Sequence, residues 1–225
     1  LPADFPQKHR SAWVDPPASL ADPLKVGETY KMFIRLMQHA DKMGFDTIWC
    51  VEHHFRENRS HMPSNEVVLG ALSQITSNIK LGFGVSLMPH EFCHPAKVAE
   101  KVATVDLLSG GRVQWGIGRS TPMEQIAFGV DIPRSKEKMC AAARSVVGMW
   151  AEEYYEEHTE FLDFPSRMVT PKPWQDPHPP VWMATATESS AIMAGENGCG
   201  LLCFSIMRPL STLKPLIEMY REAQT

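Results

Sequence analysis

The stretch "HPAKVAEKVATVDLLSGGRVQWGIGRS", residues 94–120, joins a helical pattern to an apolar strand through a pair of glycines. Its first half carries apolar residues at helical spacing, which predicts a helix over 95–108 with one buried face: Val98, Val102, Val105 and Leu108. The "SGG" that follows is typical of a helix end, because glycine readily adopts the left-handed conformation that closes helices. The strand predicted over 113–119 is apolar on both faces, as in parallel sheets covered by helices. This stretch therefore predicts one unit of an α/β fold.

The same alternation of helix and strand runs through most of the chain. One apolar stripe predicts a helix that Gly44 ends: Phe33, Leu36, Met37, Ala40 and Met43. Apolar runs predict four more strands, over 46–53, 79–88, 181–187 and 200–205. Helical patterns accompany them, over 65–78, 136–153, 188–198 and 211–224. Residues 1–26 and 171–180 are rich in proline, which predicts irregular segments.

Five parallel strands with intervening helices fit two architectures, an open doubly wound sheet and a (β/α)8 barrel. The open sheet would favour a Gly-rich first turn, and no G-x-G-x-x-G occurs between a strand and a helix here. A barrel needs eight strands and typically about 250 residues. The barrel interpretation therefore expects one strand before Leu1 and two βα units after Thr225, with residues 1–225 forming a single incomplete domain.

Composition and charge narrow the class of function. With 225 residues, 44% of them hydrophobic, the chain can bury a substantial core. A formal net charge of -4 provides no basic face and argues against nucleic acid as a partner. We find no apolar run of membrane-spanning length, so a membrane partner is not expected. Five cysteines without a C-x-x-C pair favour neither a disulfide framework nor structural zinc, which fits a reducing cytoplasm.

Polar residues gather where predicted strands end, which is the ligand-binding face in either architecture. Arg119 follows Gly116 and Gly118, so the backbone there can approach a ligand and the guanidinium can contact a phosphate at two points. A surface ion pair explains Arg119 equally well. "ATATESS" places hydroxyl residues at a predicted helix start, where free N–H groups favour an anion, although such residues are also ordinary N-caps: Thr187, Ser189 and Ser190. Together the two features suggest a phosphorylated cofactor.

"EHHF", residues 52–55, raises the question of a metal site. Successive strand residues point to opposite faces, so His53 and His54 are poorly placed to share one metal ion. Catalytic zinc takes three protein ligands, and no H-E-x-x-H motif is present. The pattern favours one imidazole that exchanges a proton beside an organic ligand, with a structural histidine as the alternative.

Four ordered blocks resemble the bacterial luciferase-like, flavin-dependent monooxygenase family: "GFDTIWCVEHHF", "IKLGFGVSLMP", "HPAKVAEKVATVDLLSGGRVQWGIGRS" and "PKPWQDPHPPVWMA". The resemblance covers the chain from about Gly44 to Leu202. It implies a (β/α)8 TIM barrel, here without its first strand and last two βα units. It also implies an enzyme that uses reduced FMN, supplied transiently by a separate flavin reductase, and molecular oxygen. Such an enzyme oxygenates a small, aldehyde-like substrate through a flavin 4a-hydroperoxide.

The resemblance also assigns roles to individual residues. His53 is similar to a histidine that lies by the flavin ring and assists proton transfer. Arg119 resembles the phosphate-binding arginine, and three residues at the helix start are assigned to the same cofactor: Ala186, Thr187 and Ser190. Gly84 and Val85 align with a segment that has an unusual cis peptide in luciferases.

One departure from the family stands next to Arg119. The reactive cysteine that luciferases carry directly before this arginine is replaced by Gly118. Light emission and luciferase's own range of aldehydes are therefore not implied for this chain.

Three other hypotheses compete with an FMN-dependent monooxygenase. A deazaflavin-dependent oxidoreductase of the same superfamily would transfer hydride without oxygen. A flavin-binding protein without turnover, or a metal-dependent hydrolase, would show no oxygenated product. A homodimer or heterodimer is expected, and the apolar helix face over 65–72 is a candidate interface that a buried core explains equally well.

Overall fold

A parallel sheet of five strands forms the centre of the computed structural model, which describes residues 22–56, 60–203 and 209–224. The strands lie in chain order: β1 (Thr47–Cys50), β2 (Lys80–Leu87), β3 (Val113–Gly118), β6 (Val181–Thr185) and β7 (Gly200–Cys203). A doubly wound sheet reverses its strand order, whereas a barrel keeps it. The unbroken order therefore favours a segment of a barrel.

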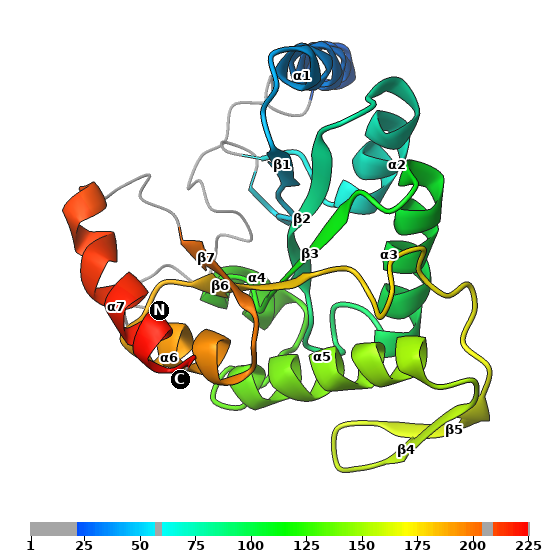
Figure 1. The fold of residues 1–225 in the computed structure, drawn as a ribbon, viewed down its shortest axis with the longest axis vertical. Helices are drawn as coiled ribbons and strands as arrows, with labels where there is room; N and C mark the ends of the chain where they lie inside the picture. Colours follow the sequence, from blue (N-terminus) through cyan, green and yellow to red (C-terminus); the bar gives the residue numbers. More distant parts are fainter. Residues whose placement is uncertain (1–21, 57–59, 204–208, 225) are drawn as a thin grey trace.

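The helices cover the outer face of this sheet, as in the wall of a barrel (Figure 1). They are α1 (Pro23–Lys42), α2 (Asn65–Ile75), α3 (Pro95–Ser109), α5 (Ser135–Ala151), α6 (Glu188–Glu196) and α7 (Lys214–Glu222). A short helix α4 (Pro122–Ala127) follows β3, and a 3-10 turn, Leu210–Leu213, precedes α7. An arc of helices around one face of the sheet is the arrangement that a (β/α) barrel requires.

The structure differs from the sequence prediction at several boundaries. α1 begins at Pro23, inside the segment predicted as irregular, because proline fits the first turn of a helix and the Asp22 side chain caps it. β1 ends at Cys50, so "EHHF" lies beyond the strand. A β-hairpin of β4 (Tyr155–His158) and β5 (Asp163–Arg167), which the sequence analysis missed, extends from the end of α5 (Figure 1). Residues 1–21 of the predicted irregular segment lie outside the described residues.

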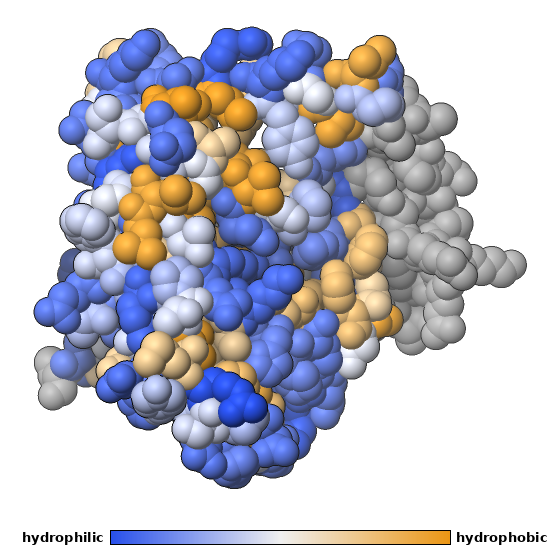
Figure 2. Space-filling model, turned by 90° about the vertical axis from the view of Figure 1, so that its right-hand side faces the viewer, coloured by the Kyte–Doolittle hydropathy of each residue, from blue (hydrophilic) through white to orange (hydrophobic). Residues whose placement is uncertain are grey.

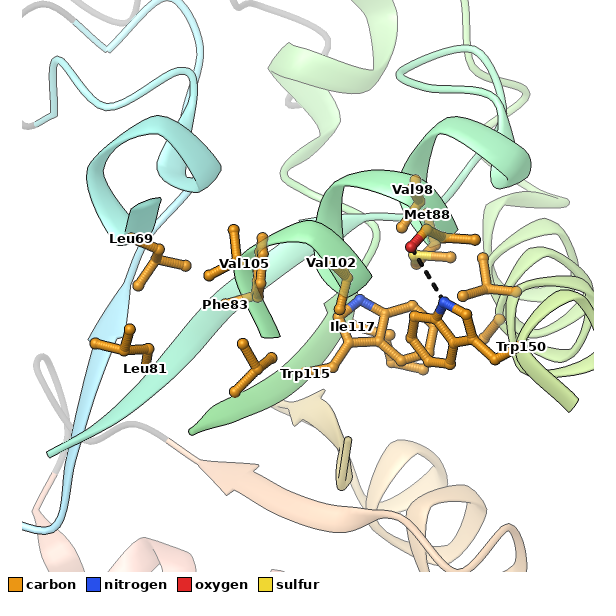
Figure 3. Close-up of a cluster of buried hydrophobic side chains, with 14 of the residues drawn as sticks. Leu69, Leu81, Phe83, Met88, Val98, Val102, Val105, Trp115, Ile117 and Trp150 are labelled. Atoms are coloured by element: carbon orange, nitrogen blue, oxygen red, sulfur yellow. Dashed lines mark hydrogen bonds between the residues drawn. The ribbon is translucent and has the colours of Figure 1, made fainter. Parts of the chain in front are cut away.

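Two tryptophans pack against each other in the core between the sheet and the helices (Figure 3). Trp115 of β3 and Trp150 of α5 meet edge to face, with ring centroids 4.9 Å apart. The Trp150 Nε1–H donates to the carbonyl oxygen of Ala99 in α3 at 3.1 Å, so the buried indole leaves no polar group unpaired. These contacts fasten α3 and α5 against β3, whose carboxyl end carries Arg119.

The inner face of the sheet carries two further tryptophans. Ile48 and Cys50 belong to the core against the helices, so Trp49 between them points to the opposite face. A Cβ on Gly82, the register partner of Trp49 on β2, would lie 2.3 Å from the Trp49 ring. The glycine therefore makes room for an indole that lies flat on the neighbouring strand. Trp182 lies over Gly200 in the same way: a Cβ on Gly200 would also lie 2.3 Å from the Trp182 ring.

Candidate functional site

The three polar motifs lie at the carboxyl ends of β1, β3 and β6, at one edge of the parallel sheet. "EHHF" forms a turn there instead of continuing β1. The His53 N–H donates to the carbonyl oxygen of Met62 at 3.0 Å, and Phe55 has a φ of +56°, in the left-handed region. The orientation of the two imidazoles is therefore determined by a turn and not by strand alternation.

Glu124 connects the turn after β1 to the loop after β3. Its Oε1 accepts hydrogen bonds from His53 Nδ1 at 3.1 Å and from the His54 backbone N–H at 2.7 Å. Its Oε2 accepts from Ser120 Oγ at 2.7 Å and from Thr121 Oγ1 at 2.5 Å. The side chain is 0% exposed, so these donors replace the water that an ionised carboxylate would otherwise bind.

The charge of Glu124 follows from this set of donors. Burial alone raises the pKa of the carboxyl, but hydrogen bonds from His53, Thr121, the His54 N–H and Ser120 together hold the pKa well below its ordinary value. Glu124 is therefore ionised at neutral pH. An ionised carboxylate only accepts hydrogen bonds, so His53 must donate to it from Nδ1.

Arg119 lies at the end of β3, on the surface. Its Nη1 donates to Ser135 Oγ at 2.9 Å, and Ser135 is the first residue of α5. The next residue, Ser120, has a φ of +65°, so the chain turns sharply directly after the arginine. Within the described part of the chain, no carboxylate forms an ion pair with Arg119, which leaves its guanidinium able to bind an anion.

The start of α6 carries a second group of side chains that could bind a phosphate, after Arg119. Thr187 Oγ1 lies 2.9 Å from Ser190 Oγ and 3.3 Å from Ser189 Oγ, so three hydroxyls gather at the first turn of the helix. Lys136 Nζ donates to Ser189 Oγ at 3.2 Å and to the Ser189 carbonyl oxygen at 3.3 Å. Ala186, directly before these hydroxyls, is exposed. The first turn of α6 thus combines hydroxyl donors with a cation.

The first turn of α5 contacts both Arg119 and the start of α6. Ser135 holds Arg119, and the following residue, Lys136, reaches Ser189 on α6. Two cations and three hydroxyls from separate elements therefore lie on one side of the molecule, an arrangement suited to a phosphate. Lys136 was not predicted from the sequence, because nothing local distinguishes a lysine at a helix start that binds a ligand from one that is only solvated.

The middle of β2 has an irregular backbone where the resemblance suggested one. The peptide bond between Gly84 and Val85 is cis, and the register with β3 shifts between Phe83 and Ser86. Asn65, at the start of α2, donates from Nδ2 to the carbonyl oxygens of Cys50 at 3.0 Å and Val85 at 3.5 Å. One buried amide thus joins β1 to the irregular part of β2.

Four rings form a cluster next to the Glu124 network. Phe128 lies 4.9 Å from the His54 ring, 4.7 Å from Phe92 and 5.7 Å from Phe55, measured between centroids. His54 also contacts Glu52, with Nε2 3.4 Å from Oε1. His54 is therefore held among aromatic rings, whereas the side chain of His53 is 35% exposed.

Neither a group of metal-binding side chains, among the described residues, nor the cavity beside α5 and α6 coincides with this site. Among the residues that the structure describes, no three His, Cys, Asp or Glu side chains lie close enough to hold a metal ion. A cavity of about 560 Å³ lies between α5 and α6 on the helix side of β6 and is lined by Ala143, Val147, Val181 and Cys199, among others. The cavity does not include His53, Arg119 or Thr187, so the site is recognised from its polar contacts.

The profile of the luciferase-like monooxygenase family matches residues 9–225 of the chain. The chain belongs to this family. The chain is 32% identical over 177 residues to the oxygenase component of flavin-dependent trigonelline monooxygenase from Acinetobacter baylyi, covering 77% of this chain and 48% of the relative. It is 30% identical over 171 residues to F420-dependent glucose-6-phosphate dehydrogenase from Kineococcus radiotolerans, covering 74% and 50%. The chain thus spans about half the length of these relatives.

A solved structure agrees with the assignment to the family. The monooxygenase RslO1 from Streptomyces bottropensis matches with a TM-score of 0.78 and 31% identity, over 88% of this chain and 60% of that structure. The luciferase-like (β/α) barrel predicted from the resemblance is confirmed, in the form of a curled sheet of five parallel strands. No helix in the described ranges is long and apolar enough to cross a membrane.

Proposed function

We propose that this protein is the oxygenase of a two-component, flavin-dependent monooxygenase, which uses reduced FMN and molecular oxygen to oxygenate a small organic substrate. The observation that supports this best is that the first turn of α5 contacts both Arg119, through Ser135, and the hydroxyls of α6, through Lys136, at the carboxyl side of the sheet. Membership of the luciferase-like family supports the reaction class. The trigonelline relative is named as an oxygenase component, which supports a separate flavin reductase as partner.

The donor set fits a phosphorylated cofactor. A phosphate dianion takes two-point hydrogen bonds from a guanidinium and further bonds from hydroxyls, and the site offers both kinds of donor. Arg119, Lys136, Thr187 and Ser190 would hold the phosphate, with Ala186 alongside. Gly84 and Val85, where the backbone of β2 is irregular, would face the ring system, as the resemblance implies.

The residues of this chain would bind, orient and shield, while a bound reduced flavin supplies the electrons that activate oxygen. His53 would hold or accept a proton at Nε2, the ring nitrogen that does not contact Glu124. The ring cluster of His54, Phe92 and Phe128 would exclude water from this side of the site.

The first experiment compares reduced FMN with a reduced deazaflavin by anaerobic titration of the full-length gene product. Removing a charged donor from a phosphate costs about 1.5–3 kcal/mol, so Arg119→Ala should weaken FMN binding roughly ten- to hundredfold. Lys136→Ala should weaken it by a smaller factor, because an ammonium is more strongly hydrated than a guanidinium and cannot make the two-point contact. Arg144→Ala is the matched control, since Arg144 is an exposed arginine on α5, the helix that carries Lys136. This variant should leave the affinity for FMN unchanged.

Admission of air then separates the reaction classes. Oxygen consumption by the FMN complex, with incorporation of labelled oxygen into a substrate, would support the monooxygenase. Binding of the deazaflavin alone, without oxygen consumption, would favour the second candidate function, which is hydride transfer by a deazaflavin-dependent oxidoreductase. The F420-dependent glucose-6-phosphate dehydrogenase relative is the observation behind this candidate. FMN affinity that is equal in the wild type and in Arg119→Ala would contradict the proposed phosphate site. Tight FMN binding without any turnover would identify a flavin-binding protein.

A further inference from the structure

The Glu124 carboxylate joins two parts of the site that lie 71 residues apart in the sequence. We infer that Glu124 is a positioning residue for His53: it fixes the imidazole as the tautomer protonated at Nδ1 and leaves Nε2 to face the ligand. The tautomer itself follows from the contacts of this chain. Only the use of Nε2 toward a flavin rests on the proposed function.

The acceptor sites of the Glu124 carboxylate are filled by donors from this chain. Oε1 accepts from His53 Nδ1 and the His54 N–H, and Oε2 accepts from the Ser120 and Thr121 hydroxyls. The Thr121 N–H approaches Oε2 as a fifth donor, at 3.4 Å. A carboxylate has about four lone-pair sites, so these donors fill the set. A proton on Glu124 would displace one of these donors, so the contacts favour a positioning role over the role of proton donor.

The charge around the carboxylate favours the same role. Arg56 places Nε 3.9 Å from Oε2 and donates from Nη2 to Thr121 Oγ1 at 3.0 Å. This guanidinium further favours the ionised form of Glu124. The fully buried, negatively charged acceptor then requires a proton on His53 Nδ1, because a lone pair directed at a carboxylate oxygen would repel it.

The backbone around the network also supports this role. The two non-glycine residues with positive φ in the described part of the chain, Phe55 (+56°) and Ser120 (+65°), flank the network on either side. Left-handed backbone is unfavourable for such residues and persists where surrounding contacts hold it. Glu124 bonds the His54 N–H directly before the first turn and the Ser120 side chain in the second, so the same carboxylate holds both turns.

His54 also lies near a carboxylate, that of Glu52, but the contact is longer. Its Nε2 lies 3.4 Å from Glu52 Oε1, a longer contact than the 3.1 Å between His53 and Glu124. Glu52 also accepts only a long bond, 3.4 Å, from the Leu87 N–H. His54 is packed among aromatic rings instead. The imidazole with a strongly bound, fully buried partner is therefore His53.

The test is the protonation pattern of the His53 ring nitrogens, measured by long-range ¹H–¹⁵N NMR on the labelled full-length gene product without cofactor. His53→Gln identifies the signals by their loss. We expect Nδ1–H in the wild type and in Glu124→Gln, which keeps an acceptor oxygen of the same size. Glu124→Leu removes the acceptor, and the Nε2–H tautomer should appear. Glu52→Gln, the matched change at the neighbouring carboxylate, should leave the His53 pattern unchanged.

Two results would overturn the inference: an Nε2–H tautomer in the wild type, or an unchanged Nδ1–H pattern in a folded Glu124→Leu variant. If the leucine variant does not fold, as judged by circular dichroism, the wild-type spectrum alone decides. Because the measurement needs no flavin, absence of FMN binding would contradict the proposed function and leave the test of Glu124 intact.

Discussion

At the scale of single residues, Gly118 and Val85 occupy space that two side chains could not share. A Cβ on Gly118 would lie 2.4 Å from Val85 Cγ2, closer than nonbonded carbon atoms approach. Gly118 stands where the resemblance expects the reactive cysteine of luciferases. The structure thus explains the departure: the valine after the cis peptide fills the volume that a side chain at position 118 would need.

Gly118→Ala should therefore destabilise the protein, and Val85→Ala should relieve the effect. Overpacking of a well-packed site costs roughly 1–3 kcal/mol. We expect Gly118→Ala to lower the free energy of unfolding by about that amount, and to cost much less in the Val85→Ala background. Urea unfolding of the four proteins of the cycle measures the coupling. Additive effects would show that the two side chains do not compete.

At the scale of elements, the end of α1 determines where β2 begins. The Asp41 carboxylate accepts hydrogen bonds from three successive backbone N–H groups: Ser77 at 2.9 Å, Asn78 at 3.0 Å and Ile79 at 2.7 Å. These donors lie in the turn between α2 and β2. The backbone hydrogen bond from Ser77 and those from Ile79 and Asn78 outweigh the opposing effect of burial and lower the pKa of Asp41.

Asp41→Asn should weaken this attachment in a pH-dependent way. Because the pKa of Asp41 is lower in the folded state, its contribution is present above the ordinary value of about 4 and is lost as the pH falls below it. We expect the variant to be less stable by about 1 kcal/mol at pH 7, since the group is partly exposed. The difference should shrink as the pH falls toward 3. Asp131→Asn, at an exposed aspartate, serves as the control, and equal losses in both variants would contradict the expectation.

At the scale of the whole molecule, Asp106 joins the start of β3 to the segment before β6, and the β4–β5 hairpin lies between these two parts in the sequence. Asp106 is fully buried in α3, and its Oδ1 accepts from the Val113 N–H at 3.3 Å and from Gln175 Nε2 at 2.8 Å. Its Oδ2 accepts from the Gln175 N–H at 2.9 Å. The segment that leads into β6 is thereby held against the start of β3, beside which β6 pairs.

Asp106→Ala should be strongly destabilising. Each buried donor left without an acceptor costs roughly 1–3 kcal/mol, and this change affects both Val113 and Gln175. Asp163→Ala is the control, because Asp163 pairs with His158 at an exposed position and such pairs contribute about 1 kcal/mol or less. Thermal unfolding followed by circular dichroism compares the two. Similar melting temperatures for both variants would show that Asp106 does not fasten the sheet.

The surface over α2 and α3 bears on the expected dimer. Figure 2 shows several separate hydrophobic areas on the side of the molecule where these helices lie. Both helices carry exposed apolar side chains: Val67, Ile75, Leu107 and Leu108. The prediction that Leu108 lies on the buried face of its helix is therefore wrong, because α3 turns only Val98, Val102 and Val105 of the predicted face toward the core. Part of the helix face over 65–72 is core, since Val68 and Leu69 are buried, whereas Val67 on the same helix is exposed. The dimer stays a prediction.

Much of the architecture could be predicted from the sequence because its causes are local. Apolar spacing predicted the helices and strands, and a single glycine, Gly44, marked a helix end that the structure places at Lys42, with Met43 as the C-cap. The hairpin β4–β5 was missed because its strands are short and polar, with Glu157 and His158 where apolar alternation would be expected. Glu124 was missed because "TPME" is also an ordinary helix start, in which glutamate follows the cap by three residues.

The sequence by itself determined the βα rhythm, the polar strand ends and the residue types at them, including His53, Arg119 and the hydroxyls of α6. These depend on spacing along the chain and on backbone preferences, which a sequence contains. Only the tertiary structure decided that Glu124 binds His53 and that Lys136 reaches Ser189. Those contacts depend on strand register and on which helices are neighbours, and both emerge only when the whole chain packs around one core.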